Sequence, residues 1–163
     1  MFDLTGRVVV VSGASSGLGA QMAEGFAAQG ADLIITARRL DRLEALADKI
    51  RGMGRKCLPL RCDVTDPDMV EETAKKAEEA FGKIDVLVNC AGSAKNAGVL
   101  DMTNDEWDFT IATDMSSVFY VTRAFARIMK KNNYGRIINI ASMYGMVGNT
   151  ALDTVAYHTS KGG

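Results

Sequence analysis

The sequence predicts an α/β fold in which a parallel sheet is covered by helices on both faces, giving three layers. Short apolar runs alternate along the 163 residues with longer stretches of helical period, which is typical of strand-helix-strand units. The first run, residues 8–11, is four consecutive valines, as expected of a strand buried on both sides. Hydrophobic residues make up 47% of the chain and charged residues 24%, which is ordinary for a globular protein and excludes a fibrous or disordered chain.

The first strand and the first helix frame a glycine-rich turn. We expect a strand over residues 7–12 and a helix from about Leu18 to Gln29, with Gly30 as its C-terminal cap. Three apolar residues lie four apart on one face of this helix, the spacing of an apolar stripe: Leu18, Met22 and Phe26.

The next segments repeat the alternation of strand and helix. Strands are expected at residues 33–36 and 57–62, and helices at 41–51 and 66–82. Asp66 and Pro67 open the second of these helices, because an aspartate caps free amides and a proline in the first helical position loses no needed donor.

The second half of the chain continues the pattern. A strand is expected at residues 84–88, and Thr103 and Glu106 form a capping box that begins a short helix. A long helix then runs to about Lys131, and a strand follows at 136–140. One side of the long helix is apolar, at Val118, Val121, Phe125 and Met129. No linker or repeat interrupts the chain, so we expect one domain over residues 1–163.

Charge and cysteine usage exclude several classes of protein. The chain has 19 Lys and Arg against 20 Asp and Glu, so no surplus charge draws it to nucleic acid or to an anionic membrane. Neither a signal-peptide pattern nor an apolar run of about 20 residues is present, so we expect a cytoplasmic protein. Cys57, Cys62 and Cys90 are odd in number and lack metal-ligand spacing, which predicts reduced thiols and no metal site.

The turn after the first strand has the pattern Gly13-x-x-x-Gly17-x-Gly19. At the N-terminus of a helix, backbone amides and the helix dipole favour a bound anion, and glycines let a pyrophosphate approach the backbone. A plain tight turn would use the same residues, but the position between a buried strand and a helix favours a phosphate site. The expected cofactor contacts here are Gly13, Ser15, Ser16, Gly17, Leu18 and Gly19.

The residues after the second strand indicate which dinucleotide binds. An acidic residue usually stands there and holds the ribose 2′-hydroxyl of NAD. This chain has Ala37, then Arg38 and Arg39, and a guanidinium pairs with a 2′-phosphate. We therefore expect NADP(H) in preference to NAD(H), with Arg38 as the main contact and Arg39 and Ser15 in support. A solvated basic pair at the end of a strand is the alternative.

Tyr157 and Lys161 lie four residues apart near the end of the sequence, so on a helix they share one face. A nearby ammonium stabilises a phenolate, which makes the phenol a better proton donor near neutral pH. Ser142 follows a predicted strand and could hydrogen-bond a carbonyl oxygen next to the phenol.

These motifs, together with Asn89-Cys90-Ala91-Gly92 and Asn139-Ile140-Ala141-Ser142, resemble the short-chain dehydrogenase/reductase family over the whole chain. The resemblance implies a Rossmann-type doubly wound parallel sheet, a homo-oligomer, and a small carbonyl or alcohol substrate. Ser12, Cys90 and Asp114 depart from the family pattern, which has threonine, asparagine and asparagine there.

The resemblance also implies roles for single residues. Tyr157 would be the general acid/base, Lys161 would make its phenol more acidic and bind the nicotinamide ribose, and Ser142 would orient the substrate. Asp114 stands where the main-chain carbonyl of an asparagine holds a water of the proton relay; an effect of its carboxylate on Lys161 is the alternative. Asp63 would bind adenine or cap a local turn. The further expected cofactor contacts are Asp63, Val64, Asn89, Ala91, Gly92, Tyr157 and Lys161.

The Ser142-Met143-Tyr144-Gly145 stretch and residues 2–6 are similar to gluconate 5-dehydrogenase-like and 3-oxoacyl-carrier-protein reductase-like members. Members of the family continue through further strands past the end of this sequence. With the strand order 3-2-1-4-5, the fifth strand would lie at an edge, so we expect self-association or reduced stability. Three readings stay open: an NADP(H)-dependent oxidoreductase, a nucleotide-binding module without turnover, and a structural domain that retains the motifs.

Overall fold

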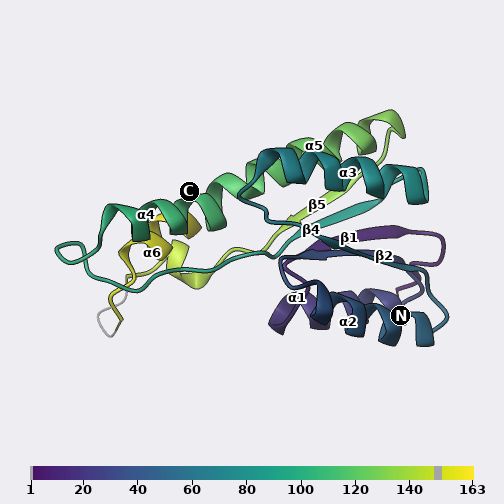
Figure 1. Ribbon diagram of the computed structural model, residues 1–163, viewed down its shortest axis with the longest axis horizontal. Helices are drawn as coiled ribbons and strands as arrows, with labels where there is room; N and C mark the ends of the chain where they lie inside the picture. The colour runs from purple at the N-terminus through teal and green to yellow at the C-terminus, as the bar shows by residue number, and fades with distance from the viewer. Residues whose placement is uncertain (1, 149–151) are drawn as a thin grey trace.

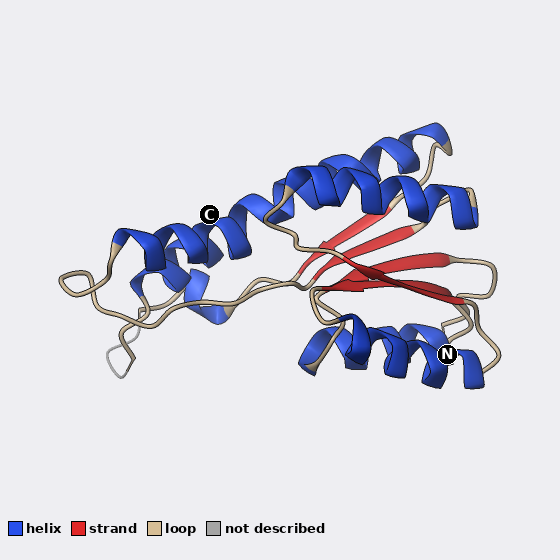
Figure 2. Ribbon diagram, in the orientation of Figure 1, coloured by secondary structure: helices blue, strands red, loops and turns tan. Residues whose placement is uncertain are grey.

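The computed structural model describes residues 2–148 and 152–163, and it has the expected three-layer arrangement (Figures 1 and 2). The sheet is parallel, with strand order β3-β2-β1-β4-β5. Helices α1 and α2 cover one face, and α3 and α5 cover the other (Figure 1). The strands are β1 (Val8–Ser12), β2 (Asp32–Ala37), β3 (Cys57–Arg61), β4 (Val86–Asn89) and β5 (Arg136–Asn139). The α-helices are α1 (Gly17–Ala28), α2 (Leu40–Gly52), α3 (Pro67–Phe81), α4 (Asn104–Ile111), α5 (Ser117–Lys131) and α6 (Val155–Gly162).

The first strand is the centre of the sheet and is fully buried. Its side chains alternate between the two faces, so that Val9 and Val11 pack under α1 and α2, whereas Val8 and Val10 pack under α3 and α5. The chain passes from β1 through α1 to β2, which pairs with one side of β1, and β4 pairs with the other side. The crevice between the loops after β1 and β4 is therefore the switch point at which ligands bind in sheets of this kind.

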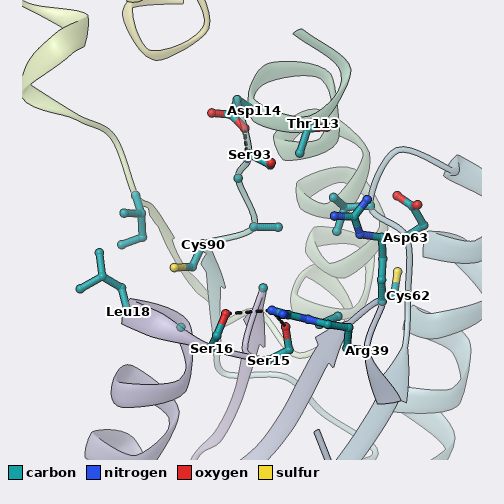
Figure 3. A pocket seen from close by; sticks show the side chains of 18 of the residues that line it. Ser15, Ser16, Leu18, Arg39, Cys62, Asp63, Cys90, Ser93, Thr113 and Asp114 are labelled. Atoms are coloured by element: carbon teal, nitrogen blue, oxygen red, sulfur yellow. Dashed lines mark hydrogen bonds between the residues drawn. The ribbon is translucent and has the colours of Figure 1, made fainter. Parts of the chain in front are cut away.

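The apolar stripe expected on α1 is partly buried, since Met22 and Phe26 pack against the core and Leu18 does not. Leu18 is 63% exposed, and the residues that α1 buries completely are small ones: Gly19, Ala23 and Ala27. Small side chains let α1 lie close to the sheet, so the first turn comes near the end of β1. Leu18 instead faces the open space above the strand ends (Figure 3).

The fourth strand begins at Val86, two residues later than expected. Asp85 stands just before it, and its carboxylate accepts a hydrogen bond from the Val8 amide at 2.9 Å. Arg7 and Lys83 contact the same carboxylate at 2.9 Å and 3.1 Å. These contacts act together with the hydrogen bond from the Asp85 amide to the Val8 carbonyl at 2.9 Å, and they hold the start of β1 against β4.

The expected short and long helices are joined without a break. Ala112–Ser116 forms a π-helical turn between α4 and α5, and such turns are frequent at functional sites. The Thr103–Glu106 capping box is present as predicted at the start of α4.

Helices α4 and α6 form a lobe beside the sheet, together with the short 3-10 helix η2 (Met143–Gly145) (Figure 1). The chain reaches this lobe from the ends of β4 and β5. In the described residues β5 is the edge strand, and Ile137 and Ile138 are 41% and 42% exposed. None of the described helices combines the length and apolarity needed to span a bilayer.

Candidate active site

A cleft of about 730 Å³ lies at the C-terminal ends of the strands, between the glycine turn and the lobe. It is lined by residues from each βα unit and from α6. The sequence-predicted residues that line it are Gly13, Ser15, Ser16, Leu18, Gly19, Arg38, Arg39, Asp63, Val64, Ala91, Gly92, Asp114, Tyr157 and Lys161. Motifs from both ends of the sequence therefore meet in one cavity.

The glycine turn packs directly on the loop after β4. Gly13 has φ +73°, and a Cβ there would lie 2.6 Å from the Ala91 Cα, so a side chain is excluded. The Ser12 hydroxyl oxygen accepts hydrogen bonds from the Cys90 and Ala91 amides at 3.1 Å and 3.3 Å. The hydroxyl that Ser12 keeps from the family threonine thus ties β1 to the loop after β4.

The first turn of α1 has no side-chain cap. Ser16 is the N-cap residue but makes no capping hydrogen bond, and no acidic residue lies in the first turn. In contrast, the Asp66 side chain caps α3. The Ser15 and Ser16 hydroxyl oxygens both accept from Arg39 Nη2 at 2.9 Å (Figure 3). The first amides of α1 are therefore left for an anion, with a guanidinium beside them.

The ends of β2 and β3 complete this side of the cleft. Ala37 ends β2, Arg38 and Arg39 follow it, and all three line the cleft. Asp63 lines it as well, and its Oδ1 accepts from the Thr65 amide at 3.1 Å and from the Thr65 hydroxyl at 2.8 Å. Asp63 therefore shapes the local turn, one of the two expected roles, while it also borders the cavity.

Tyr157 and Lys161 lie at the opposite end of the cleft, both on α6. The Lys161 ammonium donates a hydrogen bond to the Ile140 carbonyl at 3.0 Å and lies 5.7 Å from the centre of the Tyr157 ring. The ammonium and the Tyr157 ring therefore lie near each other at this end of the cleft.

Asp114 is buried in the π-helical turn at the same end. Its side chain is 0% exposed, Oδ1 accepts from the Ser93 amide at 2.6 Å (Figure 3), and Oδ2 lies 3.9 Å from Lys161 Nζ. Asp114 Oδ2 and the neighbouring Thr113 hydroxyl oxygen make no hydrogen bond to the described residues, although both residues line the cleft. Buried polar atoms without a hydrogen-bond partner indicate a place for ligand or water.

Three expected site residues do not line the cleft: Gly17, Asn89 and Ser142. Gly17 begins α1 with φ +58°. Asn89 is buried below the cleft, where its Nδ2 donates to the Thr122 hydroxyl and to Asn139 Oδ1, both at 2.9 Å. This hydrogen bonding joins β4 to α5 and β5.

Ser142 caps η2 beside α6. Its hydroxyl oxygen accepts from the Tyr144 amide at 3.2 Å, which leaves the hydroxyl hydrogen free to be donated. The Tyr144 ring packs edge-on against the Tyr157 ring, with 6.1 Å between centroids. A Cβ at Gly145 would clash with the Lys161 carbonyl oxygen, so η2 and α6 approach closely. The segment after Ser142 thereby fixes the positions of Tyr157 and Lys161.

Several lining residues were not predicted from the sequence: Cys62, Cys90, Ser93, Thr113, Ile140 and Ala141. Most of these residues are next to a predicted site residue in the sequence. Their position just after β3, β4 or β5 is the feature from which they could have been predicted. Burial raises the pKa of the Cys90 thiol, and the Lys161 charge partly offsets this. All three cysteines are free, and residues 2–148 and 152–163 contain no cluster of His, Cys, Asp or Glu suited to a metal ion.

Comparison with known proteins gives consistent matches. The model of the short chain dehydrogenase family matches residues 7–163. The chain is 39% identical over 147 residues to the 3-oxoacyl-[acyl-carrier-protein] reductase of Escherichia coli, covering 90% of this chain and 59% of that protein. It is 34% identical over 160 residues to the reductase of the same name from Thermotoga maritima, covering 98% of this chain and 64% of that protein.

The fold matches solved structures equally well. The crystal structure of a short-chain type dehydrogenase/reductase from Mycobacterium marinum superposes with a TM-score of 0.95 at 38% identity, over 99% of this chain and 64% of that one. The chain thus spans about three fifths of the length of the relatives it matches.

Proposed function

The chain belongs to the short-chain dehydrogenase family, and from this we propose that it is an NADP(H)-dependent oxidoreductase that interconverts a carbonyl compound and a secondary alcohol. The observation that carries the proposal is the shared cleft. An anion-binding helix start lies at one end of it, and a tyrosine with a lysine beside it lies at the other.

The residues around the cleft fit a dinucleotide. The uncapped first turn of α1 offers amide donors to a pyrophosphate, and Gly13 and Gly19 keep side chains out of the turn. A cavity of about 730 Å³ lies within the range of ordinary ligand sites. Asp63 and Val64 would border the adenine, and Ala91 and Gly92 would give a flat surface along the cofactor.

The preference for NADP(H) rests on the basic residues after β2. Arg38 and Arg39 border the cleft, and no carboxylate stands at Ala37 to hold an unmodified ribose. Arg39 already lies against Ser15 and Ser16, so a 2′-phosphate would meet a guanidinium and two hydroxyls together. We propose that Arg38 and Arg39 share this contact.

We propose that Tyr157 is the proton donor and acceptor of the reaction. When bound, the cofactor supplies or accepts the hydride. In the reductive direction, the Tyr157 phenol gives its proton to the carbonyl oxygen, and the Lys161 ammonium stabilises the phenolate left behind. The Ser142 hydroxyl hydrogen would hold the carbonyl oxygen in place. The main-chain carbonyl of Asp114 would hold a water that returns a proton to this end.

A nucleotide-binding module without turnover is the second candidate. Ser142 does not line the cleft, and the chain covers only about three fifths of its relatives, which favour this reading. On either reading the cofactor-binding residues are the same.

Binding and turnover are tested separately. We expect calorimetric titration to show that NADPH binds more tightly than NADH. We then expect NADPH oxidation with some member of a panel of ketones, aldehydes and 3-oxoacyl thioesters. Failure of both nucleotides to bind would reject the proposed function, and binding without oxidation across the panel would leave the module reading.

Tyr157→Phe tests the assigned proton donor. Because it removes only the hydroxyl, we expect turnover to fall by at least about 10³-fold while NADPH affinity changes less than about twofold. Tyr144→Phe is the matched control, since its ring packs on Tyr157 but its hydroxyl has no assigned role. Turnover retained in Tyr157→Phe would reject the assignment.

A further inference from the structure

The hydrogen bond that Asp114 makes does not require a carboxylate. Its Oδ1 accepts from the Ser93 amide, and the amide oxygen of an asparagine would accept the same bond. Its second oxygen makes no hydrogen bond to the described residues. What aspartate adds over asparagine at this position is therefore a negative charge, held in a side chain that is 0% exposed.

That charge acts on one end of the cleft. The charged residues that line the cleft are Arg38, Arg39 and Asp63 at the nucleotide end, and Asp114 and Lys161 at the other. Asp114 Oδ2 lies 3.9 Å from the Lys161 ammonium, whose side chain is 12% exposed. Two opposite charges this close, with little water between them, cancel much of each other's field at that end.

Only one part of a nicotinamide cofactor changes charge in the reaction. The nicotinamide ring is cationic when oxidised and neutral when reduced, whereas the phosphates and the adenine are the same in both forms. A lone ammonium would therefore disfavour the oxidised form specifically, and a carboxylate beside it removes that penalty.

We propose that Asp114 sets the preference of the cleft between the two redox forms of the cofactor, favouring NADP⁺ relative to NADPH. The proposal rests on the proposed function, since it needs the nicotinamide at the Tyr157 end. Asp114 acts here through charge, so the role is separate from any water held by its main-chain carbonyl.

A preference for NADP⁺ over NADPH affects the direction of the reaction. In reduction, Tyr157 would give a proton to the carbonyl oxygen, and a bound cofactor would supply the hydride to the carbonyl carbon and so become the oxidised, cationic form. By linkage, tighter binding of the oxidised form shifts the equilibrium on the protein toward alcohol and NADP⁺. The same contact slows the release of NADP⁺.

The test is the ratio of the dissociation constants of NADP⁺ and NADPH, measured by calorimetry without substrate. In Asp114→Asn the Ser93 hydrogen bond can persist, and we expect the Kd of NADP⁺ to rise about 3- to 10-fold more than that of NADPH. Lys161→Met removes the opposite charge, so the ratio should move in the other direction. If the two substitutions only disturbed the structure, they would not change the ratio of the dissociation constants in opposite directions.

Asp63→Asn is the matched control, because it removes a carboxylate from the nucleotide end of the same cleft. We expect it to change the two affinities equally, so that their ratio stays within about twofold. A ratio unchanged in both Asp114→Asn and Lys161→Met would overturn the inference while leaving the proposed function intact. If Asp114→Asn fails to fold, the ratio of the two dissociation constants in Lys161→Met is the test of the inference. If the unaltered chain binds neither form, the proposed function fails and the inference fails with it.

Discussion

Arg38 and Arg39 stand where a dinucleotide site distinguishes a phosphate from a hydroxyl. Arg38→Asp replaces a guanidinium that favours a 2′-phosphate with a carboxylate that repels it and accepts from a ribose hydroxyl. We expect the NADPH-to-NADH affinity ratio to fall by about 10- to 100-fold in calorimetric titrations.

The control for this change is Arg42→Asp, an exposed residue of α2 that does not line the cleft. It alters the net charge equally and should leave the ratio unchanged. Arg39→Ala should weaken NADPH alone if the two arginines share the phosphate. An unchanged ratio in both Arg38→Asp and Arg39→Ala would refute the assignment.

Cys90 gives a measure of cofactor binding that needs no turnover. Burial raises the pKa of Cys57 to about 12 and also raises the pKa of Cys62, and both thiols are buried. Cys90 lines the cleft and is only partly buried, and Lys161 partly offsets the rise in its pKa. We expect iodoacetamide at pH 8 to alkylate Cys90 first, as followed by peptide mass spectrometry.

Saturating NADPH should slow the alkylation of Cys90 by at least about fivefold and leave Cys57 unaffected, because Cys90 lines the cleft and Cys57 does not. Equal labelling of Cys90 with and without NADPH, at a concentration that calorimetry shows to saturate, would place the cofactor elsewhere.

At the residue scale, the type of a residue indicated its backbone conformation where only that type fits, whereas packing decided where other side chains lie. Gly13 has a positive φ and no room for a side chain, so the presence of a glycine at this position indicated the turn. Asn89 and Ser142 were matched by motif, yet hydrogen bonds within the fold place Asn89 below the cleft and turn Ser142 toward η2. The spacing of residues along the sequence does not indicate the direction in which the Asn89 and Ser142 side chains point.

At the scale of elements, the hydrophobic pattern predicted the existence and order of strands and helices. The start of β4 shifted to Val86, and just before it the Asp85 carboxylate, not a backbone carbonyl, accepts from the Val8 amide. On α1, small residues are buried completely and Met22 and Phe26 pack partly against the core, whereas Leu18 of the same predicted face is left exposed at the cleft. The π-helical turn before α5 has no signal in residue spacing.

Asp85 joins the start of β1 to β4, and its role predicts a pH dependence. Burial raises its pKa, but hydrogen bonds from Val8, Arg7 and Lys83 outweigh this, so the net pKa is lowered. A lowered pKa stabilises the fold above the ordinary aspartate value of about 3.9, and this contribution is lost as the pH falls below it. Asp85→Asn should lower the free energy of unfolding by about 1–3 kcal/mol at pH 7.

Urea unfolding at pH 7 and pH 3 measures this effect, and the difference between Asp85→Asn and the unaltered chain should shrink at pH 3. Asp48→Asn is the control, since Asp48 forms an exposed ion pair with Arg51 on α2 and should leave the unfolding midpoint unchanged. A difference that is equal at both pH values would show that the charge of Asp85 is not responsible.

On the scale of the whole molecule, the sheet and the lobe carry different parts of the proposed active site. The loops at the nucleotide end follow the strands of the sheet, and α6 belongs to the lobe beside the sheet (Figure 1). Helix α6 carries Tyr157 and Lys161, and the π-helical turn carries Asp114. The cleft depends on β5, because the chain passes from this strand through Ile140 and Ala141 into the lobe, and Ile140 accepts from Lys161. Disturbing the edge of the sheet therefore affects both stability and the site.

The exposed edge also predicts how copies of the chain interact. In the described residues β5 pairs with β4 alone, and Ile137 and Ile138 are each about two fifths exposed. An apolar edge strand offers unpaired amides and carbonyls to a second strand. We expect the 163-residue chain to self-associate, with a mass by light scattering well above 17.5 kDa.

Ile138→Lys places a charge on this edge and should shift the scattering mass toward that of one chain, because edge lysines block strand pairing. Leu100→Lys is the matched control, since Leu100 is 94% exposed in the loop before α4, away from the edge. If association persists in Ile138→Lys and disappears in Leu100→Lys, the contact lies on the lobe. An unaltered chain that scatters as a monomer at all concentrations would refute association through β5, whose edge would then stay unpaired in solution.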